Sequence, residues 1–145
     1  MTHKKTDMKF TLLLLLGLSF MTVSFVSSEK AVPSIELKGN ASSGIKFSKM
    51  SLEKAMKQAR ETGQIIFIDV HTSWCGPCKE MAKTTFTDSE VGSVFNQRFI
   101  NLKIDAEKDA DGPMVSRAYS VSAYPTLLFI NGDGKMVRKL VGKQS

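Results

Sequence analysis

The sequence has few residues of the kinds that form covalent or metal cross-links. It contains two cysteines and two histidines among 145 residues. A closed zinc site usually needs four ligands, and beyond residue 28 the only histidine or cysteine besides the cysteine pair is His71. Zinc binding is therefore the weaker explanation for the two cysteines, and redox chemistry is the stronger one.

The sequence also lacks an apolar run of about 20 residues, the length that a typical membrane-spanning helix needs. The run Leu12–Val26 has about 15 residues, follows three lysines and precedes small residues at 26–28. Because this order is typical of a signal peptide, we expect residues 1–28 to direct export to a bacterial periplasm or an equivalent compartment. The alternative is an uncleaved segment that anchors the chain in a membrane. No cysteine lies near the predicted cleavage site, which excludes a cysteine-linked lipid anchor.

A strong excess of one charge is absent too. The formal net charge is +6, and three of the 20 basic and one of the 14 acidic residues lie in 1–28, which leaves +4. The remaining charges are scattered, so nucleic acid is not an expected partner. Residues 29–44 are rich in Ser, Gly, Lys and Asn, which predicts a flexible leader. Residues 45–145 are enough for one domain, and we see no internal repeat.

The most informative feature that is present is the run WCGPCK at residues 74–79, which holds both cysteines. A pair at this spacing closes a small ring, so its oxidised and reduced forms can be close in free energy. A structural disulfide stabilises most when it closes a long loop. The spacing of Cys75 and Cys78 therefore favours a redox-active pair over a structural one.

The cysteines lie where a strand is predicted to lead into a helix. Residues 64–70 form a short apolar, β-branched run, and residues 78–83 are good helix formers. Backbone N–H groups and the dipole at a helix N-terminus stabilise a thiolate, which predicts Cys75 as the nucleophile. Pro77 has no N–H to lose in the first helical turn and helps to hold Cys78 within reach of Cys75.

Periodicity predicts the other elements. Leu52, Ala55, Met56 and Ala59 share one face of a helix over 51–60, and Gly63 follows it as a stop. A second helix, capped by Asp88, spans 89–98 with Val91, Val94 and Phe95 on its buried face. A short helix is expected at 113–119, strands at 99–105, 127–130 and 135–141, and a hairpin turn at 131–134. This order predicts an α/β sandwich with a mixed sheet.

Three separated motifs resemble the thioredoxin family over roughly the last hundred residues. They are the cysteine run, Asp69 six residues before Cys75, and Tyr124-Pro125-Thr126 before an apolar strand. The resemblance implies a thioredoxin fold, a buried Asp69 that moves a proton for Cys78, and a cis peptide bond before Pro125.

The resemblance also implies how substrate is bound. The residues that would contact a protein disulfide substrate are Trp74, Gly76, Pro77, Tyr124 and Pro125. No cofactor is implied beyond the Cys75–Cys78 disulfide, and no metal. Simpler interpretations remain open: Asp69 as an ordinary carboxylate at a strand end, Trp74 as a core residue, and Tyr124 as a packing residue.

The sequence departs from the family pattern in three places. Asn101 occupies the position where thioredoxins often have a lysine near the buried acid, and His71 stands where many have an aromatic residue. His71 is either a half-buried polar residue or a positive charge that lowers the pKa of Cys75. The chain stops at Ser145 without the family's final helix, so either the sequence is truncated or that face is covered by something else. We expect a domain that is less stable than its relatives or that associates through this face.

Together these features predict a thiol-disulfide oxidoreductase that reduces disulfides of exported proteins through a mixed disulfide. The Gly-Pro pair between the cysteines resembles reducing thioredoxins, and a reductant in an oxidising compartment needs a membrane-embedded thiol-disulfide electron donor. Two alternatives remain: an oxidase or isomerase that uses the same site, and a non-catalytic binding module with the thioredoxin fold.

Overall fold

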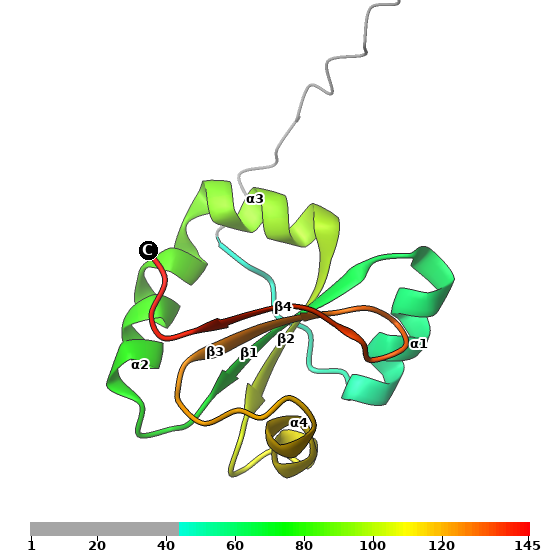
Figure 1. Ribbon diagram of the computed structural model, residues 1–145. Coiled ribbons are helices and arrows are strands. Elements are labelled where there is room, and N and C mark those ends of the chain that lie inside the picture. Colours follow the sequence, from blue (N-terminus) through cyan, green and yellow to red (C-terminus); the bar gives the residue numbers. More distant parts are fainter. Residues whose placement is uncertain (1–43) are drawn as a thin grey trace, which may run out of the picture. The chain divides into compact units, whose positions relative to one another are not determined.

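The computed structural model describes residues 44–145, so the predicted signal peptide and the predicted leader up to residue 43 lie outside the described residues. In this part of the chain, four strands form one mixed sheet (Figure 1). They are β1 (Ile65–His71), β2 (Phe99–Asp105), β3 (Thr126–Ile130) and β4 (Met136–Val141). Their order is β2-β1-β3-β4, with β1 parallel to β2 and β3 antiparallel to β1 and β4. The predicted α/β architecture with a mixed sheet is confirmed.

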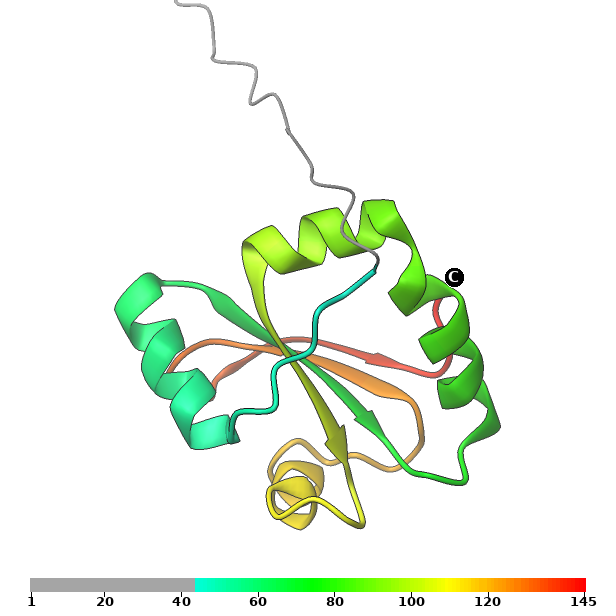
Figure 2. The same ribbon diagram turned by 180° about the vertical axis from the view of Figure 1, so that it is seen from behind.

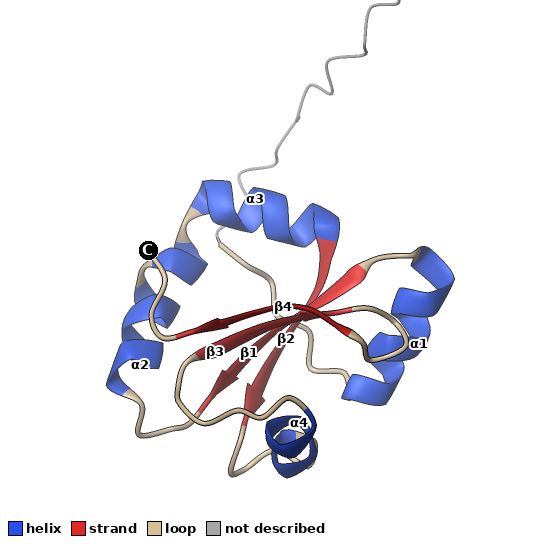
Figure 3. Ribbon diagram, viewed as in Figure 1, coloured by secondary structure: helices blue, strands red, loops and turns tan. Residues whose placement is uncertain are grey.

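Helices cover both faces of this sheet (Figure 3). On one face lie α1 (Leu52–Thr62) and α4 (Gly112–Ala118). On the other lie α2 (Gly76–Lys83), the 3-10 turn η1 (Thr85–Thr87) and α3 (Ser89–Arg98). Residues 44–51 run past β2 towards α1 (Figure 2), and Ser48 forms a parallel bridge with Leu102 there. The edge of β2 is therefore partly covered by the chain's own N-terminal segment.

The alternation of side chains along β1 positions the site. Ile66 and Ile68 belong to the core on the α1 side, whereas Phe67 belongs to the core on the α2 side. Because successive side chains of a strand point to opposite faces, Asp69 and His71 share the face of Phe67. The same strand thus contributes to both cores and carries two ionisable groups towards the elements that follow the cysteines.

Capping residues set the ends of two helices, and the sequence predicts Gly63 and Asp88 among them. The Ser51 side chain accepts a hydrogen bond from the Lys54 backbone N–H at the start of α1. Gly63 ends α1 with φ of 72°, a left-handed conformation that glycine adopts without steric cost. The Asp88 side chain accepts from the N–H groups of Glu90 and Val91 at the start of α3.

The predicted buried face of α3 is wrong at one position. Val94 is 45% exposed, and Gly92 is the buried residue of this helix. A Cβ atom on Gly92 would lie 2.3 Å from the carbonyl oxygen of Gly44. The helix therefore turns its glycine towards the segment that precedes α1, a backbone approach that hydrophobic periodicity does not reveal.

Aromatic side chains fill the core beneath α2 and α3. The Phe67 ring lies 4.8 Å from that of Phe95 and 5.1 Å from that of Phe129, with Phe47 and Phe86 also around it. In the described residues no helix follows β4. This face is packed against α2, η1, α3 and Phe47, and Phe129 and Leu140 on it are only partly buried.

Candidate active site

Cys75 and Cys78 form a disulfide at the start of α2. Their sulfur atoms are 2.01 Å apart, and both residues are buried, with 3% and 2% of their surface exposed. Cys75 is the N-cap residue of α2, and its Sγ accepts a hydrogen bond from the Cys78 backbone N–H at 3.1 Å. An N–H donor at a helix N-terminus also stabilises a thiolate, so this position suits Cys75 as the nucleophile of the reduced form.

An exposed rim surrounds the buried disulfide. Gly76 and Pro77 are exposed, and Trp74 is 63% exposed, so the interpretation of Trp74 as a core residue is wrong. The Trp74 ring meets the ring of Tyr124 edge to face at 5.8 Å, and its Nε1 donates to both carboxylate oxygens of Glu107 at 3.1 Å. Nothing in the spacing of the loop after β2 indicates this contact, so Glu107 could not be found from the sequence.

The expected cis peptide bond is present between Tyr124 and Pro125. The loop that contains it is held on both sides. The Thr126 hydroxyl donates to the Ala123 carbonyl at 2.7 Å, and the Gly142 N–H donates to the Pro125 carbonyl at 2.8 Å. Tyr124 is half-buried and packs on the core at the α1 side while its ring contacts Trp74, so it both packs and contributes to the rim.

Asp69 is completely buried inside β1. It lies opposite Lys103 of β2, and the Lys103 Nζ is 3.5 Å from the Asp69 Oδ2. Burial raises the pKa of Asp69 above its ordinary value, while the charge of Lys103 and then that of His71 act to lower it. Because Asp69 lies within the strand, the alternative of a carboxylate at a strand end does not fit, and its buried carboxyl group is suited to exchanging a proton.

The lysine that accompanies the acid is Lys103, which the sequence analysis did not identify. Asn101 instead lies opposite Phe67, and its side-chain amide donates to the Phe95 carbonyl at 3.3 Å. Lys103 is two residues further along β2, on the same face, and directly opposite Asp69. The lysine is present in the sequence, but only the register between the two parallel strands assigns it to Asp69.

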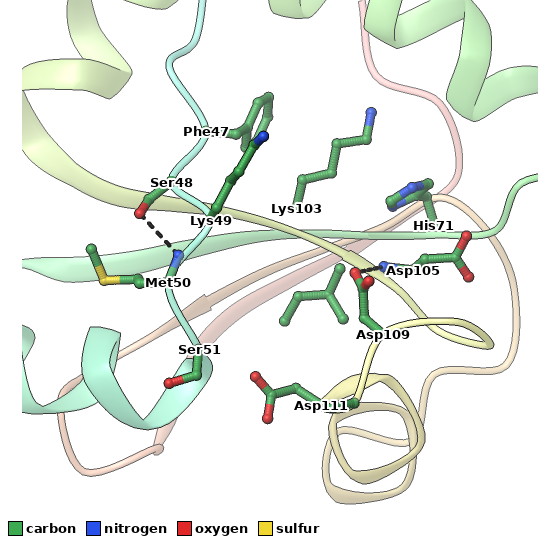
Figure 4. A pocket seen from close by; sticks show the side chains of 12 residues that line it. Phe47, Ser48, Lys49, Met50, Ser51, His71, Lys103, Asp105, Asp109 and Asp111 are labelled. Carbon is green, nitrogen blue, oxygen red and sulfur yellow. Dashed lines mark hydrogen bonds between the residues drawn. The ribbon is translucent and has the colours of Figure 1, made fainter.

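A cavity of about 230 Å³ lies between the end of β1 and α2, and Cys78, His71 and Lys103 are among the residues that line it. Thr72 also lines it, and the Thr72 Oγ1 is buried without a hydrogen-bond partner. A larger pocket of about 680 Å³ adjoins on the β2 side and shares His71 and Lys103 (Figure 4). These two residues therefore lie between the resolving cysteine and the larger pocket.

The site and fold place the chain among known proteins. The family model described as thioredoxin-like matches residues 48–132, which include the cysteine pair, Asp69 and Pro125. The chain belongs to the thioredoxin-like family. As in thioredoxin folds, its mixed sheet is flanked by helices on both faces, although no helix follows β4 in the described residues.

Curated relatives include thioredoxins and parts of larger proteins. The chain is 35% identical over 97 residues to a thioredoxin H-type of Oryza sativa subsp. indica, covering 66% of this chain and 71% of the relative. It is 34% identical over 84 residues to the thiol:disulfide interchange protein DsbD of Tatumella citrea. That match covers 57% of this chain but only 14% of the relative, so the likeness to DsbD concerns a small part of that protein.

A solved structure is also similar to this chain. The chain is 45% identical to a putative disulphide-isomerase from Bacteroides thetaiotaomicron, with a TM-score of 0.64 and coverage of 71% of this chain and 84% of that one. Within residues 44–145, no helix is long and apolar enough to cross a membrane. The thioredoxin-like chain, with its vicinal pair Cys75 and Cys78, is thus a thiol-disulfide oxidoreductase.

Proposed function

We propose that this protein is exported and reduces disulfide bonds of other exported proteins. The observation that carries the proposal is the cysteine pair itself, with the Cys75 Sγ at a helix N-terminus and Cys78 beside a cavity that Lys103, the ionic partner of the buried Asp69, also lines. The exposed Trp74 and the cis-proline loop form a surface beside the disulfide on which a substrate backbone can lie.

The chemistry begins with the reduced protein. The Cys75 thiolate attacks one sulfur of a substrate disulfide, the substrate S–S bond breaks, and the first substrate thiolate leaves and takes up a proton. Cys78 then gives its proton to the Asp69 carboxylate, and the Cys78 thiolate attacks the Cys75 Sγ. The Cys75–Cys78 bond forms, the mixed disulfide breaks, and the second substrate thiolate leaves. Two electrons have passed from the protein to the substrate.

Three features support the proposed direction of electron flow and the proposed export. The Gly76-Pro77 pair resembles that of reducing thioredoxins, and residues 1–28 have the composition of a signal peptide. Part of the chain is similar to DsbD, whose name describes a thiol:disulfide interchange protein. A reductant in the periplasm has to be reduced again, so its partner would be a membrane-embedded thiol-disulfide electron donor.

A second candidate is disulfide isomerisation or oxidation at the same site. It is favoured by the 45% identity to a solved protein described as a putative disulphide-isomerase. Both candidates use the same mixed disulfide and differ in the reduction potential of the couple. A non-catalytic binding module is a third possibility and needs neither cysteine.

A trapping experiment tests whether the pair catalyses exchange. Without Cys78 the mixed disulfide cannot be resolved, so the Cys78→Ser variant should accumulate covalent complexes with protein disulfide substrates on a non-reducing gel. The Cys75→Ser variant is the matched control and should accumulate none. Equal behaviour of the two variants, or failure of the wild type to reduce insulin disulfides, would support the binding module instead.

A further inference from the structure

The buried acid needs a route by which its proton reaches solvent. Asp69 has no exposed surface, and neither of its carboxylate oxygens has a hydrogen-bond partner among the described residues. In the mechanism proposed above, it takes a proton from Cys78 in each cycle. Until the proton leaves Asp69 it can return to the Cys78 thiolate and undo the deprotonation, and a fully buried group cannot release it directly to water.

His71 is near Asp69 on β1 and lines the larger pocket. It lies two residues beyond Asp69 on β1, on the same face of the strand. The His71 Nδ1 is buried without a hydrogen-bond partner, whereas the ring lines both the small cavity beside Cys78 and the larger pocket. In Figure 4 the His71 and Lys103 side chains extend to the same side of the sheet.

Lys103 cannot relay this proton, although it lies directly opposite Asp69 in the strand register. Its ammonium group is a donor only and has no lone pair to accept a proton. A neutral imidazole accepts a proton at one nitrogen and releases one from the other. Of the two side chains that line both cavities, His71 is therefore the one with the chemistry of a relay.

Other charged groups surround the imidazole. Asp69 lies on the same strand as His71. From β2, the imidazole faces Lys103 and Asp105, and Asp105 is the register partner of His71. Asp109 of the following loop and Lys49 of the N-terminal segment line the larger pocket, and Lys79 of α2 lines the small cavity. Acidic and basic groups thus both face the ring, and a relay there would exchange protons with water in a pocket of mixed charge.

We propose that His71 is the proton relay of this oxidoreductase: it takes from Asp69 the proton that Cys78 gave up and releases it into the larger pocket. His71 acts through Asp69 and not directly on the sulfur atoms. The step leaves the Asp69 carboxylate ionised, the imidazole neutral again and one proton in solvent, with no change in oxidation state. The inference rests on the proposed dithiol chemistry.

Stopped-flow oxidation of the reduced full chain by the aromatic disulfide 5,5′-dithiobis(2-nitrobenzoate) tests this relay. Attack by Cys75 releases one coloured thiolate, at a rate that depends on reagent concentration. Attack by Cys78 on the mixed disulfide then releases a second thiolate in a unimolecular phase. A relay for the Cys78 proton should affect only that second phase.

The expected result for His71→Ala is a second phase about tenfold slower or more at low buffer concentration, in the range that a positioned proton carrier contributes. The first phase should be unchanged. Added imidazole should restore the second phase, because it can enter the pocket that His71 lines and carry the proton instead. His71→Gln, which fills more of the space, should show the same slowing with little rescue, and it also serves if the alanine variant does not fold. Lys49→Gln, which changes a residue of the larger pocket alone, is the matched control and should leave both phases unchanged.

The remaining outcomes decide against the relay. An unchanged second phase in both His71 variants, or slowing that imidazole does not relieve in His71→Ala, would overturn it. A slower first phase would show that His71 acts on the charge of Cys75 instead. Failure of the wild-type protein to release the second thiolate would overturn the dithiol chemistry itself, which keeps the two hypotheses distinguishable.

Discussion

At the scale of single residues, the chemistry depends on one acid that is costly to bury. Asp69 is completely buried, and its ionic partner among residues 44–145, Lys103, is 3.5 Å away and partly exposed. Removing an ionised carboxylate from water is unfavourable unless its partners compensate fully. The raised pKa of Asp69 shows that here they do not. The protein therefore keeps this group at a cost in stability, as is common for functional sites.

This cost predicts that the Asp69→Asn variant is more stable than the wild type, by an amount that depends on pH. Because the folded-state pKa of Asp69 is raised, its contribution favours folding most below the unfolded pKa of about 3.9 and is lost as the pH rises through the folded-state pKa. At pH 8 we expect Asp69→Asn to be more stable than the wild type by on the order of 1 kcal/mol, with the difference shrinking towards pH 4. Urea unfolding of both proteins across this range measures the difference. A variant that is less stable at pH 8 would contradict this account of Asp69.

At the scale of elements, the segment before α1 fixes how α3 packs. Gly92 of α3 touches the backbone of Gly44 so closely that a Cβ atom would lie 2.3 Å from the Gly44 oxygen. The Asn96 side chain of α3 donates to the same oxygen at 3.0 Å, and its Oδ1 accepts from the Lys46 N–H at 2.8 Å. The segment and the helix therefore hold each other in place over the aromatic core.

The Gly92→Ala substitution tests this contact, because helix propensity and the backbone clash predict changes of opposite sign in the free energy of unfolding. In an ordinary helix interior, alanine in place of glycine stabilises by about 1 kcal/mol. Here the clash is with backbone, so we expect a loss of about 1–3 kcal/mol in the free energy of unfolding. Val94→Ala, at an exposed position of the same helix, should change stability by about 0.5 kcal/mol or less. A stabilised Gly92→Ala variant would show that the two backbones are not in contact.

The elements could be predicted from the sequence, because each depends on local patterns. Gly63 and Asp88 mark helix ends, and apolar runs mark the strands. Relations between elements could not be predicted in this way. Lys103 and Asn101 lie two residues apart on one strand, and only the register of β1 against β2 decides which of them meets Asp69. The contact between Trp74 and Glu107 depends in the same way on where a loop lies in space.

At the scale of the whole molecule, the fold separates two sides of one reaction. The exposed Trp74 contacts Tyr124 of the cis-proline loop beside the buried disulfide, and in the proposed function a substrate binds there. Behind it, Cys78 opens on a cavity that His71 and Lys103 connect with the larger pocket. In the proposed function, electrons leave through the first side and protons leave through the second, so substrate binding need not block proton release.

The central claim is the direction of electron flow, and the reduction potential of the Cys75–Cys78 couple tests it most directly. Equilibration of the protein against glutathione buffers, with the reduced fraction counted by thiol alkylation, gives this potential. The account predicts a value near that of thioredoxin, about −270 mV. A value between about −180 and −120 mV, in the range of disulfide isomerases and oxidases, would contradict it and assign the protein to disulfide formation or isomerisation.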